Sequence, residues 1–162
     1  MVKKKHPGGR PPKFKNVEEM QVNFKSLNTD DFDRESDLVD FIALNIKVFT
    51  IDILNDELVS FEIEKPINKR NQMSPRGRRI DIYIKGKSRN YIIETKNPQY
   101  YAENRYAIGQ LLDYGREIDN AELVLITTKY DLNTAKTIKH YNLPIRYIYF
   151  DKKVNAEYLR DG

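Results

Sequence analysis

Two apolar segments joined by a short polar turn constrain the fold of this chain more than any other feature. Ile80, Ile82 and Ile84 alternate with polar or aromatic neighbours, which is the period-two pattern of a strand with one buried face. Residues 85–90, KGKSRN, supply a polar reversal that contains glycine, and residues 91–95 return as a second apolar strand. The sequence therefore predicts a β-hairpin.

The predicted hairpin brings two carboxylates together. If the turn centres near Lys87 and Ser88, Asp81 lies directly opposite Glu94. Lys96 shares the face of Glu94, because side chains two apart in a strand point the same way. Like charges directly opposite each other destabilise a sheet, and a Mg²⁺ ion, which prefers carboxylate and water ligands, would offset that cost. With a lysine close by to orient or deprotonate the attacking water, the set is suited to hydrolysing a phosphodiester.

This arrangement, Asp81 followed by Glu94-Thr95-Lys96, resembles the signature of the PD-(D/E)xK nuclease superfamily, to which many restriction endonucleases and archaeal Holliday junction resolvases belong. The resemblance covers residues 33–150. Ile80 stands where the name-giving proline would be, at a position that varies within the family.

The resemblance implies an α/β fold with a restriction-endonuclease-like mixed central sheet flanked by helices. It also implies a metal site that uses Mg²⁺, for which Mn²⁺ can substitute, held by Asp81, Glu94, the carbonyl of Thr95 and Glu35. Lys96 would activate water, and Gln110 would support Lys96 or touch the substrate phosphate. The implied catalytic residues are Glu35, Asp81, Glu94, Lys96 and Gln110.

Two of these residues also have plain structural explanations. Glu35 opens an apolar helix-like segment, and an acid in the first turn favours the helix macrodipole. Asp37 and Asp40 compete with it for any functional role. Gln110 lies at the edge of an apolar helical stripe, where a glutamine can simply be a hydrogen-bonded core residue. Only the family resemblance favours the functional interpretation of both.

The chain has a net charge of +4, and its basic residues are clustered. Residues 3–15 carry only basic charges, and residues 65–79 form a basic loop that leads directly to Asp81. Such clusters suit a nucleic acid, although an unevenly charged solvated surface would look the same. The nucleic-acid contacts that we expect are Arg10, Lys13, Lys69, Arg70, Arg76, Arg78, Arg79 and Tyr114.

The basic N-terminal segment contains Gly8-Gly9-Arg10-Pro11-Pro12-Lys13, which resembles an AT-hook. An extended arginine fits the narrow minor groove of A/T-rich DNA. The alternative is a basic tail that touches phosphates without sequence preference. The segment also resembles the opening of some phage terminase small subunits, which would indicate a viral or prophage origin.

Composition predicts one compact domain with an extension. We expect a flexible tail at residues 1–27 and a nuclease domain at residues 28–162. The absence of cysteine excludes disulfides, thiolate zinc sites and cysteine nucleophiles. No apolar segment is long enough to cross a bilayer, and the basic start has no apolar segment behind it. We therefore expect a protein without a membrane partner, in the cytoplasm, or in the host cytoplasm if it is viral.

Periodicity predicts the other elements. The expected helices are residues 17–27, 35–47, 103–118 and 131–141, and the further strands are 48–53, 58–63, 122–128 and 145–150. The continuous apolar segment at 122–128 indicates a central strand that is buried on both faces. The polar tail from residue 151 is expected to fray.

The function predicted from these observations is a metal-dependent DNA endonuclease. The alternatives are a catalytically silent nucleic-acid-binding module, which would bind DNA equally well in EDTA, and an RNA-directed nuclease. The substrate would be duplex or branched DNA, and a duplex would favour a homodimer because it has two strands. The sequence shows no obvious aromatic platform for single strands, although Tyr100, Tyr101 and Tyr106 follow the second strand closely.

Overall fold

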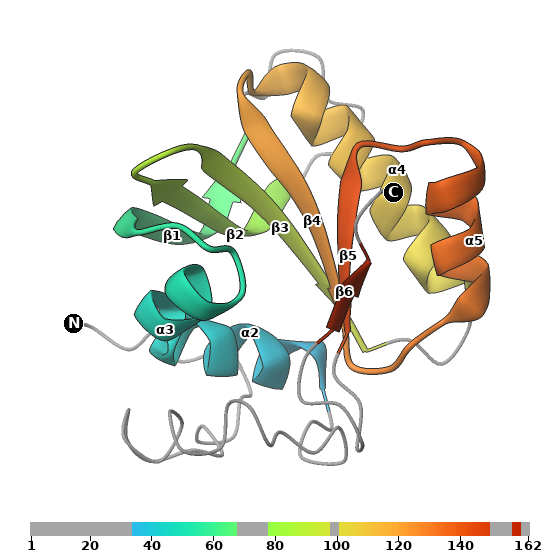
Figure 1. Ribbon diagram of the computed structural model, residues 1–162, viewed down its shortest axis with the longest axis horizontal. Helices are drawn as coiled ribbons and strands as arrows, with labels where there is room; N and C mark the ends of the chain where they lie inside the picture. The colour runs from blue at the N-terminus through green and yellow to red at the C-terminus, as the bar shows by residue number, and fades with distance from the viewer. Residues whose placement is uncertain (1–33, 68–77, 98–100, 150–156, 160–162) are drawn as a thin grey trace.

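A six-stranded mixed sheet lies between two layers of helices (Figure 1). The computed structural model describes residues 34–67, 78–97, 101–149 and the backbone of 157–159. The elements, in chain order, are α2 (Glu35–Leu44), α3 (Ile46–Asp52), β1 (Leu58–Pro66), β2 (Arg79–Gly86), β3 (Asn90–Lys96), α4 (Tyr101–Glu117), β4 (Ala121–Thr127), α5 (Leu132–His140), β5 (Ile145–Tyr149) and β6 (Glu157–Leu159). The predicted α/β class, a mixed central sheet flanked by helices, is confirmed.

The strands lie side by side in the order of the sequence, from β1 to β6. β1, β2 and β3 pair antiparallel, β3, β4 and β5 pair parallel, and β6 returns antiparallel to β5. The parallel pairs are joined through α4 and α5, as parallel connections require a crossover. The carboxyl ends of β3, β4 and β5 therefore lie at one edge of the sheet.

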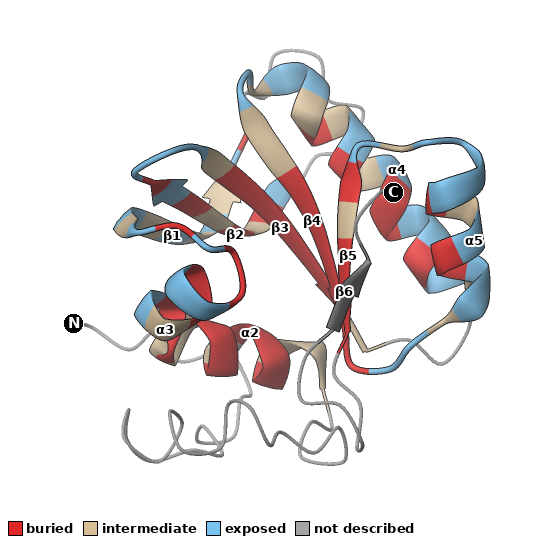
Figure 2. Ribbon diagram, viewed as in Figure 1, coloured by how far each residue is buried: buried red, intermediate tan, exposed pale blue. Residues whose placement is uncertain are grey.

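Each face of the sheet has its own apolar core (Figure 2). Val124 and Ile126 pack with α2 and α3, whereas Leu123 and Leu125 pack with α4 and α5. All four side chains are buried, so β4 is covered on both faces, as its apolar sequence predicted.

The prediction of a strand at residues 48–53 is wrong, because these residues form α3. α2 ends at Leu44, and Asn45 takes a non-helical conformation with φ −117° and ψ 26° before the chain turns helical again. Phe49 and Ile53, four residues apart, are then buried in the core that Val124 and Ile126 share with α2, which we call the first core. Side chains that suit a strand by composition were placed by tertiary packing on a helix.

Several predictions fall at or beyond the limits of the described residues. The N-terminal tail at 1–27 and its predicted helix at 17–27 lie outside them. The short strand β6 lies in the polar segment where the sequence predicted only a fraying tail. Within the described ranges, no helix combines the length and apolar character needed to cross a membrane.

The turn between β2 and β3 is fixed by a buried carboxylate from the loop before β1. Asp56 accepts hydrogen bonds from the backbone N–H groups of Ser88 (3.1 Å) and Arg89 (3.3 Å) and from the Tyr91 hydroxyl (2.9 Å). A Cβ at Gly86 would lie 2.5 Å from Oδ2 of Asp56, so the turn approaches this carboxylate closely only because residue 86 is glycine. The contact sets the hairpin register.

Replacing Asp56 by alanine should lower the free energy of unfolding at pH 7 by about 2–3 kcal/mol, since each hydrogen bond to a charged group contributes roughly 1.5–3 kcal/mol. Burial alone would raise the pKa of Asp56, but the hydrogen bonds from Glu57, Tyr91, Ser88 and Arg89 outweigh it and lower the pKa below 3.8. The stabilisation is therefore present above about pH 4 and is lost as pH falls through the lowered value. Urea unfolding at pH 7 and pH 3 checks both effects.

Glu57→Ala is the matched control, because Glu57 makes an exposed ion pair with Lys87 (3.6 Å) that should contribute less than about 1 kcal/mol. Equal effects of Asp56→Ala and Glu57→Ala would contradict the anchoring role of Asp56.

Candidate active site

The strands β2 and β3 part where the two predicted carboxylates meet. Their backbone pairing runs from Lys85 and Asn90 to Ile82 and Ile93, and the next pair in register would be Asp81 and Glu94. The neighbouring β1–β2 and β3–β4 ladders continue past this level. The register is the one that a turn centred on Lys87 and Ser88 predicts.

At Asp81 and Glu94, side-chain carboxylates replace backbone carbonyls as the acceptors of hydrogen bonds between β2 and β3. Oε1 of Glu94 accepts a hydrogen bond from the Asp81 backbone N–H (3.3 Å). Oδ2 of Asp81 accepts from both the backbone N–H (2.9 Å) and the hydroxyl (3.0 Å) of Thr95. Each carboxylate is thereby held to the opposite strand, and the pair is fixed without direct ladder bonds.

β2 is also strongly twisted about its own axis at this point. Ile82 and Ile84 pack in the core under α2 and α3, whereas Ile80, two residues earlier, packs in the core under α4 and α5. Residues two apart in a regular strand share a face. Because Ile80 and Ile82 face opposite sides of the sheet, the twist of the strand lies at Asp81.

The pair is electrostatically unfavourable as it stands. Glu94 is only 2% exposed. Burial and then the nearness of Asp81 raise the pKa of Glu94 to about 9. Burial also raises the pKa of Asp81, although the hydrogen bonds from Thr95 act against the shift. The charge of Lys96 lowers both pKa values but does not offset burial and mutual repulsion, and a bound cation would add the missing positive charge.

Lys96 and Glu35 complete the cluster. Nζ of Lys96 lies 3.6 Å from Oε1 of Glu35, which stands in the first turn of α2. Burial raises the pKa of Glu35, Lys96 lowers it, and the charge of Asp81 raises it further. The structure therefore brings Glu35, Asp81, Glu94 and Lys96 together from three elements. Their chemical roles stay predictions.

The residues fit a metal ion held by few protein ligands. In the part of the chain that the structure describes, no three Asp, Glu, His or Cys side chains converge as a ready-made metal cluster. Mg²⁺ needs no such cluster, because it typically keeps several waters and is bound by one or two carboxylates. Asp81 and Glu94 meet that requirement, and Glu35 is engaged by Lys96.

Gln110 and Tyr114 of α4 are hydrogen-bonded to each other and to the start of β2. Nε2 of Gln110 donates to the Tyr114 hydroxyl (3.3 Å), which donates to the carbonyl of Arg79 (3.1 Å). The Tyr114 ring is fully buried, so a direct contact with nucleic acid does not fit this structure. Burial, followed by the charges of Glu94 and Asp81, raises the Tyr114 pKa. The tyrosine therefore anchors the start of β2 beside the carboxylates.

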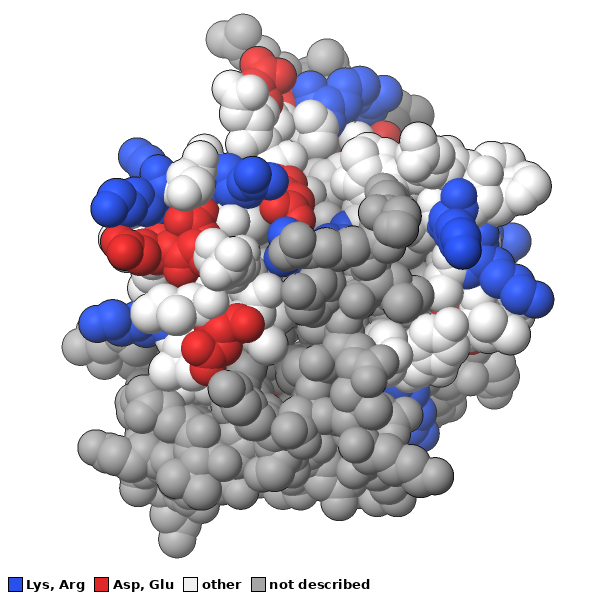
Figure 3. Space-filling view, in the orientation of Figure 1, with Lys and Arg blue, Asp and Glu red and all other residues white. Residues whose placement is uncertain are grey.

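The basic residues predicted to bind nucleic acid are only partly described. Arg78 is half-buried and pairs with Asp113 (3.2 Å), and Arg79 is exposed. Arg10, Lys13, Lys69, Arg70 and Arg76 lie outside the described residues. On the face shown in Figure 3, the basic and acidic side chains over β1, β2 and β3 are interspersed and do not form one patch.

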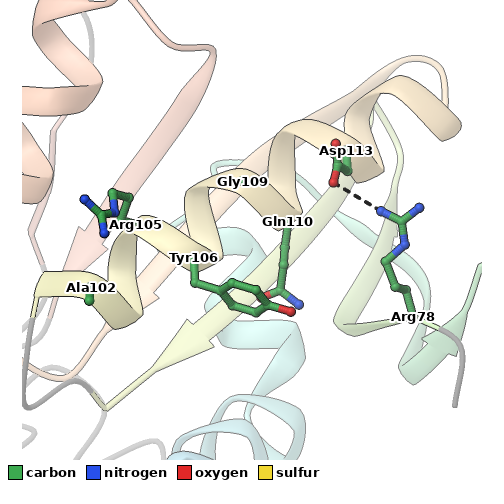
Figure 4. Close-up of a pocket in the computed structure, with 7 residues that line it drawn as sticks. All are labelled: Arg78, Ala102, Arg105, Tyr106, Gly109, Gln110 and Asp113. Atoms are coloured by element: carbon green, nitrogen blue, oxygen red, sulfur yellow. Dashed lines mark hydrogen bonds and ion pairs between the residues drawn. The ribbon is translucent and has the colours of Figure 1, made fainter. Parts of the chain in front are cut away.

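Sequence reasoning missed a pocket on the outer side of α4, which we call the α4 pocket (Figure 4). It has a volume of about 430 Å³ and is lined by Arg78, Ala102, Arg105, Tyr106, Gly109, Gln110 and Asp113. The signal was present in the chain, because Ala102, Tyr106, Gly109 and Asp113 recur at spacings of three and four and so share one helix face.

Comparisons with known proteins add little. No family model matches the chain, and no curated protein matches it. A solved structure that aligns with it is the small subunit of the heterodimeric restriction endonuclease R.BspD6I. The two share 14% identity, the alignment covers 72% of each chain, and the TM-score is 0.40. So loose a likeness says nothing about activity, and the site stands on its own geometry.

The raised pKa of Glu94 makes the metal-free protein lose stability as pH rises. Between about pH 4.5 and pH 9 the folded protein holds a proton on Glu94 that the unfolded chain has released, so the free energy of unfolding falls with increasing pH. Glu94→Gln should remove this slope and raise stability at pH 9 by more than about 1 kcal/mol. Urea unfolding in EDTA from pH 5 to pH 9 measures it.

The exposed Glu62 on β1 supplies the control, and Glu62→Gln should leave the slope unchanged. An identical slope in wild type and Glu94→Gln would show that Glu94 is charged at neutral pH without a cation.

Proposed function

We propose that this chain is a Mg²⁺-dependent nuclease that hydrolyses phosphodiester bonds in DNA. The observation that carries the proposal is the parting of β2 and β3 at Asp81 and Glu94, which leaves a buried glutamate opposite a half-buried aspartate. A sheet gains nothing from such a pair. A site that binds a cation and acts on phosphate would require such a pair of carboxylates.

Asp81 and Glu94 would hold the metal ion, Mg²⁺ or Mn²⁺ in its place. The carbonyl of Thr95 and the carboxylate of Glu35 are proposed as further ligands. When bound, the ion would supply positive charge that stabilises the phosphate as negative charge develops on it during hydrolysis.

The other residues of the cluster have separate tasks. The ammonium of Lys96 lies on the face of Glu94, where it can orient the attacking water and favour negative charge on the phosphate. Glu35 lies 3.6 Å from that ammonium and so holds it in position. Gln110 is assigned a positioning task, because it acts through Tyr114 on the strand that carries Asp81.

The nucleic acid would approach along the start of β2. Arg79 is exposed there and Arg78 is partly exposed, so both can reach backbone phosphates. Arg10, Lys13, Lys69, Arg70 and Arg76 are proposed as additional phosphate contacts. A homodimer is proposed if both strands of a duplex are cut.

A cleavage assay tests the proposal. The purified chain should cut DNA in Mg²⁺ or Mn²⁺ and not in EDTA, and Glu94→Ala and Lys96→Ala should each lower the rate at least about 100-fold, because each removes a group that acts on the reacting phosphate. Linear duplex, single strand, four-way junction and RNA substrates define the preference, and circular dichroism checks that the variants fold.

Lys85→Ala, an exposed lysine at the turn end of β2, is the control for loss of a lysine, and it should cut normally. DNA binding that persists in EDTA with no cutting of any substrate would favour the catalytically silent binding module instead.

Metal binding should also be visible without cleavage. Mg²⁺ should raise the thermal unfolding midpoint of the wild-type chain, with a stabilisation of about 1.4 kcal/mol at ten times the dissociation constant. The same addition should leave the midpoints of Asp81→Asn and Glu94→Gln unchanged, because each lacks one ligand charge. Differential scanning calorimetry measures the shift. A shift of equal size in all three proteins would show that the ion binds at another site.

A further inference from the structure

The α4 pocket is connected to the proposed active site by hydrogen bonds. Gln110 forms part of its wall and connects through Tyr114 to the carbonyl of Arg79, two residues before Asp81. Tyr106 and Gln110 are four residues apart and project from one side of α4 (Figure 4). The pocket wall is therefore tied by two hydrogen bonds to the strand that carries Asp81.

Three properties of the pocket suit a flat aromatic ligand. The Tyr106 side chain is 66% exposed, so its ring is available for stacking. A Cβ at Gly109 would meet no described atom within 4 Å, so the wall beside the ring is open. Oε1 of Gln110 is buried and has no hydrogen-bond partner among the described residues. A buried acceptor left unpaired is costly. A rotation of the Gln110 amide toward the pocket would let a donor on a ligand satisfy it.

The charges around the pocket suit a phosphate-bearing ligand. Arg78 and Arg105 both line it, and the single acid, Asp113, is paired with Arg78 (3.2 Å) and Arg116 (3.3 Å). The planar guanidinium group matches phosphate oxygens well. The pocket thus combines an aromatic face, an amide edge and cations, which are the groups that bind unpaired nucleotides.

We propose that the α4 pocket receives an unpaired nucleotide of the substrate, with its base stacked on Tyr106 and hydrogen-bonded to Gln110. Bases inside an uninterrupted duplex are stacked on both faces and paired at their edges, so they cannot make these contacts. The inference rests on the proposed function and narrows it. The substrate is DNA that is single-stranded or branched beside the cleaved bond.

Binding measured in EDTA tests the pocket without any cleavage. A single-stranded DNA oligonucleotide containing 2-aminopurine should bind the full chain, with its fluorescence quenched as the base stacks. Tyr106→Ala and Gly109→Leu should each weaken binding about 10-fold or more, the size typical of one base stacked on an aromatic ring. Binding of an uninterrupted duplex should change less than about twofold.

Matched variants separate stacking from general damage. Tyr106→Phe keeps the ring and Gly109→Ala leaves the pocket open, so both should bind like the wild type. Tyr141 is equally exposed (68%) and lies after α5, so Tyr141→Ala should have no effect. Equal binding of the single strand by the wild type, Tyr106→Ala and Gly109→Leu would overturn the proposal. It would also be overturned if these variants lost duplex binding as much as single-strand binding.

The cleavage assay distinguishes this inference from the proposed function. Cutting of single-stranded or branched DNA that falls with Tyr106→Ala supports both. Cutting that is unaffected by Tyr106→Ala and Gly109→Leu overturns the pocket and keeps the nuclease. Selective single-strand binding without metal-dependent cutting keeps the pocket and overturns the nuclease. An RNA oligonucleotide of the same sequence, if bound more tightly, would overturn DNA as the source of the nucleotide.

Discussion

The repulsion between Asp81 and Glu94 is the constraint on which the rest of this structure depends. Two carboxylates that lie opposite each other in a sheet, one of them buried, cannot both stay charged without a compensating positive charge. The chain meets this by parting β2 and β3, by donating the Thr95 and Asp81 backbone N–H groups to the carboxylates, and by placing Lys96 on the same face. These devices fix the pair in place, but none of them supplies enough positive charge to lower the pKa of Glu94.

Elements far from the pair hold it in register. The carboxylate of Asp56 binds the turn at the opposite end of the hairpin, and a slip of one residue there would move Asp81 to the other face. On the far side, the buried Tyr114 of α4 binds the carbonyl of Arg79, immediately before the strands part. The hairpin is thus tied at both ends, and its central isoleucines fill the cores between the ties.

Local patterns in the sequence were enough to predict the hairpin, its register and the central strand β4, because a period of two and a glycine-containing turn act over a few residues. They failed at residues 48–53, where packing against the first core placed β-branched and aromatic side chains on α3. The Tyr114 prediction failed for a different reason. Tyr114 lies in the apolar stripe of α4, a signal of burial that the family resemblance outweighed, and the side chain is fully buried. The α4 pocket needed the fold as well, since Arg78 joins it from another element.

The burial of Glu94 bears on what kind of DNA the proposed site can accept. A carboxylate that is 2% exposed lies below the surface, and a phosphate must approach it closely to share a metal ion. A rigid duplex presents its phosphates on a convex surface, whereas an unpaired strand can bend and insert one nucleotide. In the proposed pocket Tyr106 and Gln110 would hold such a nucleotide, and they lie on the helix whose Tyr114 positions β2. The same helix would then align the substrate and the carboxylates that act on it.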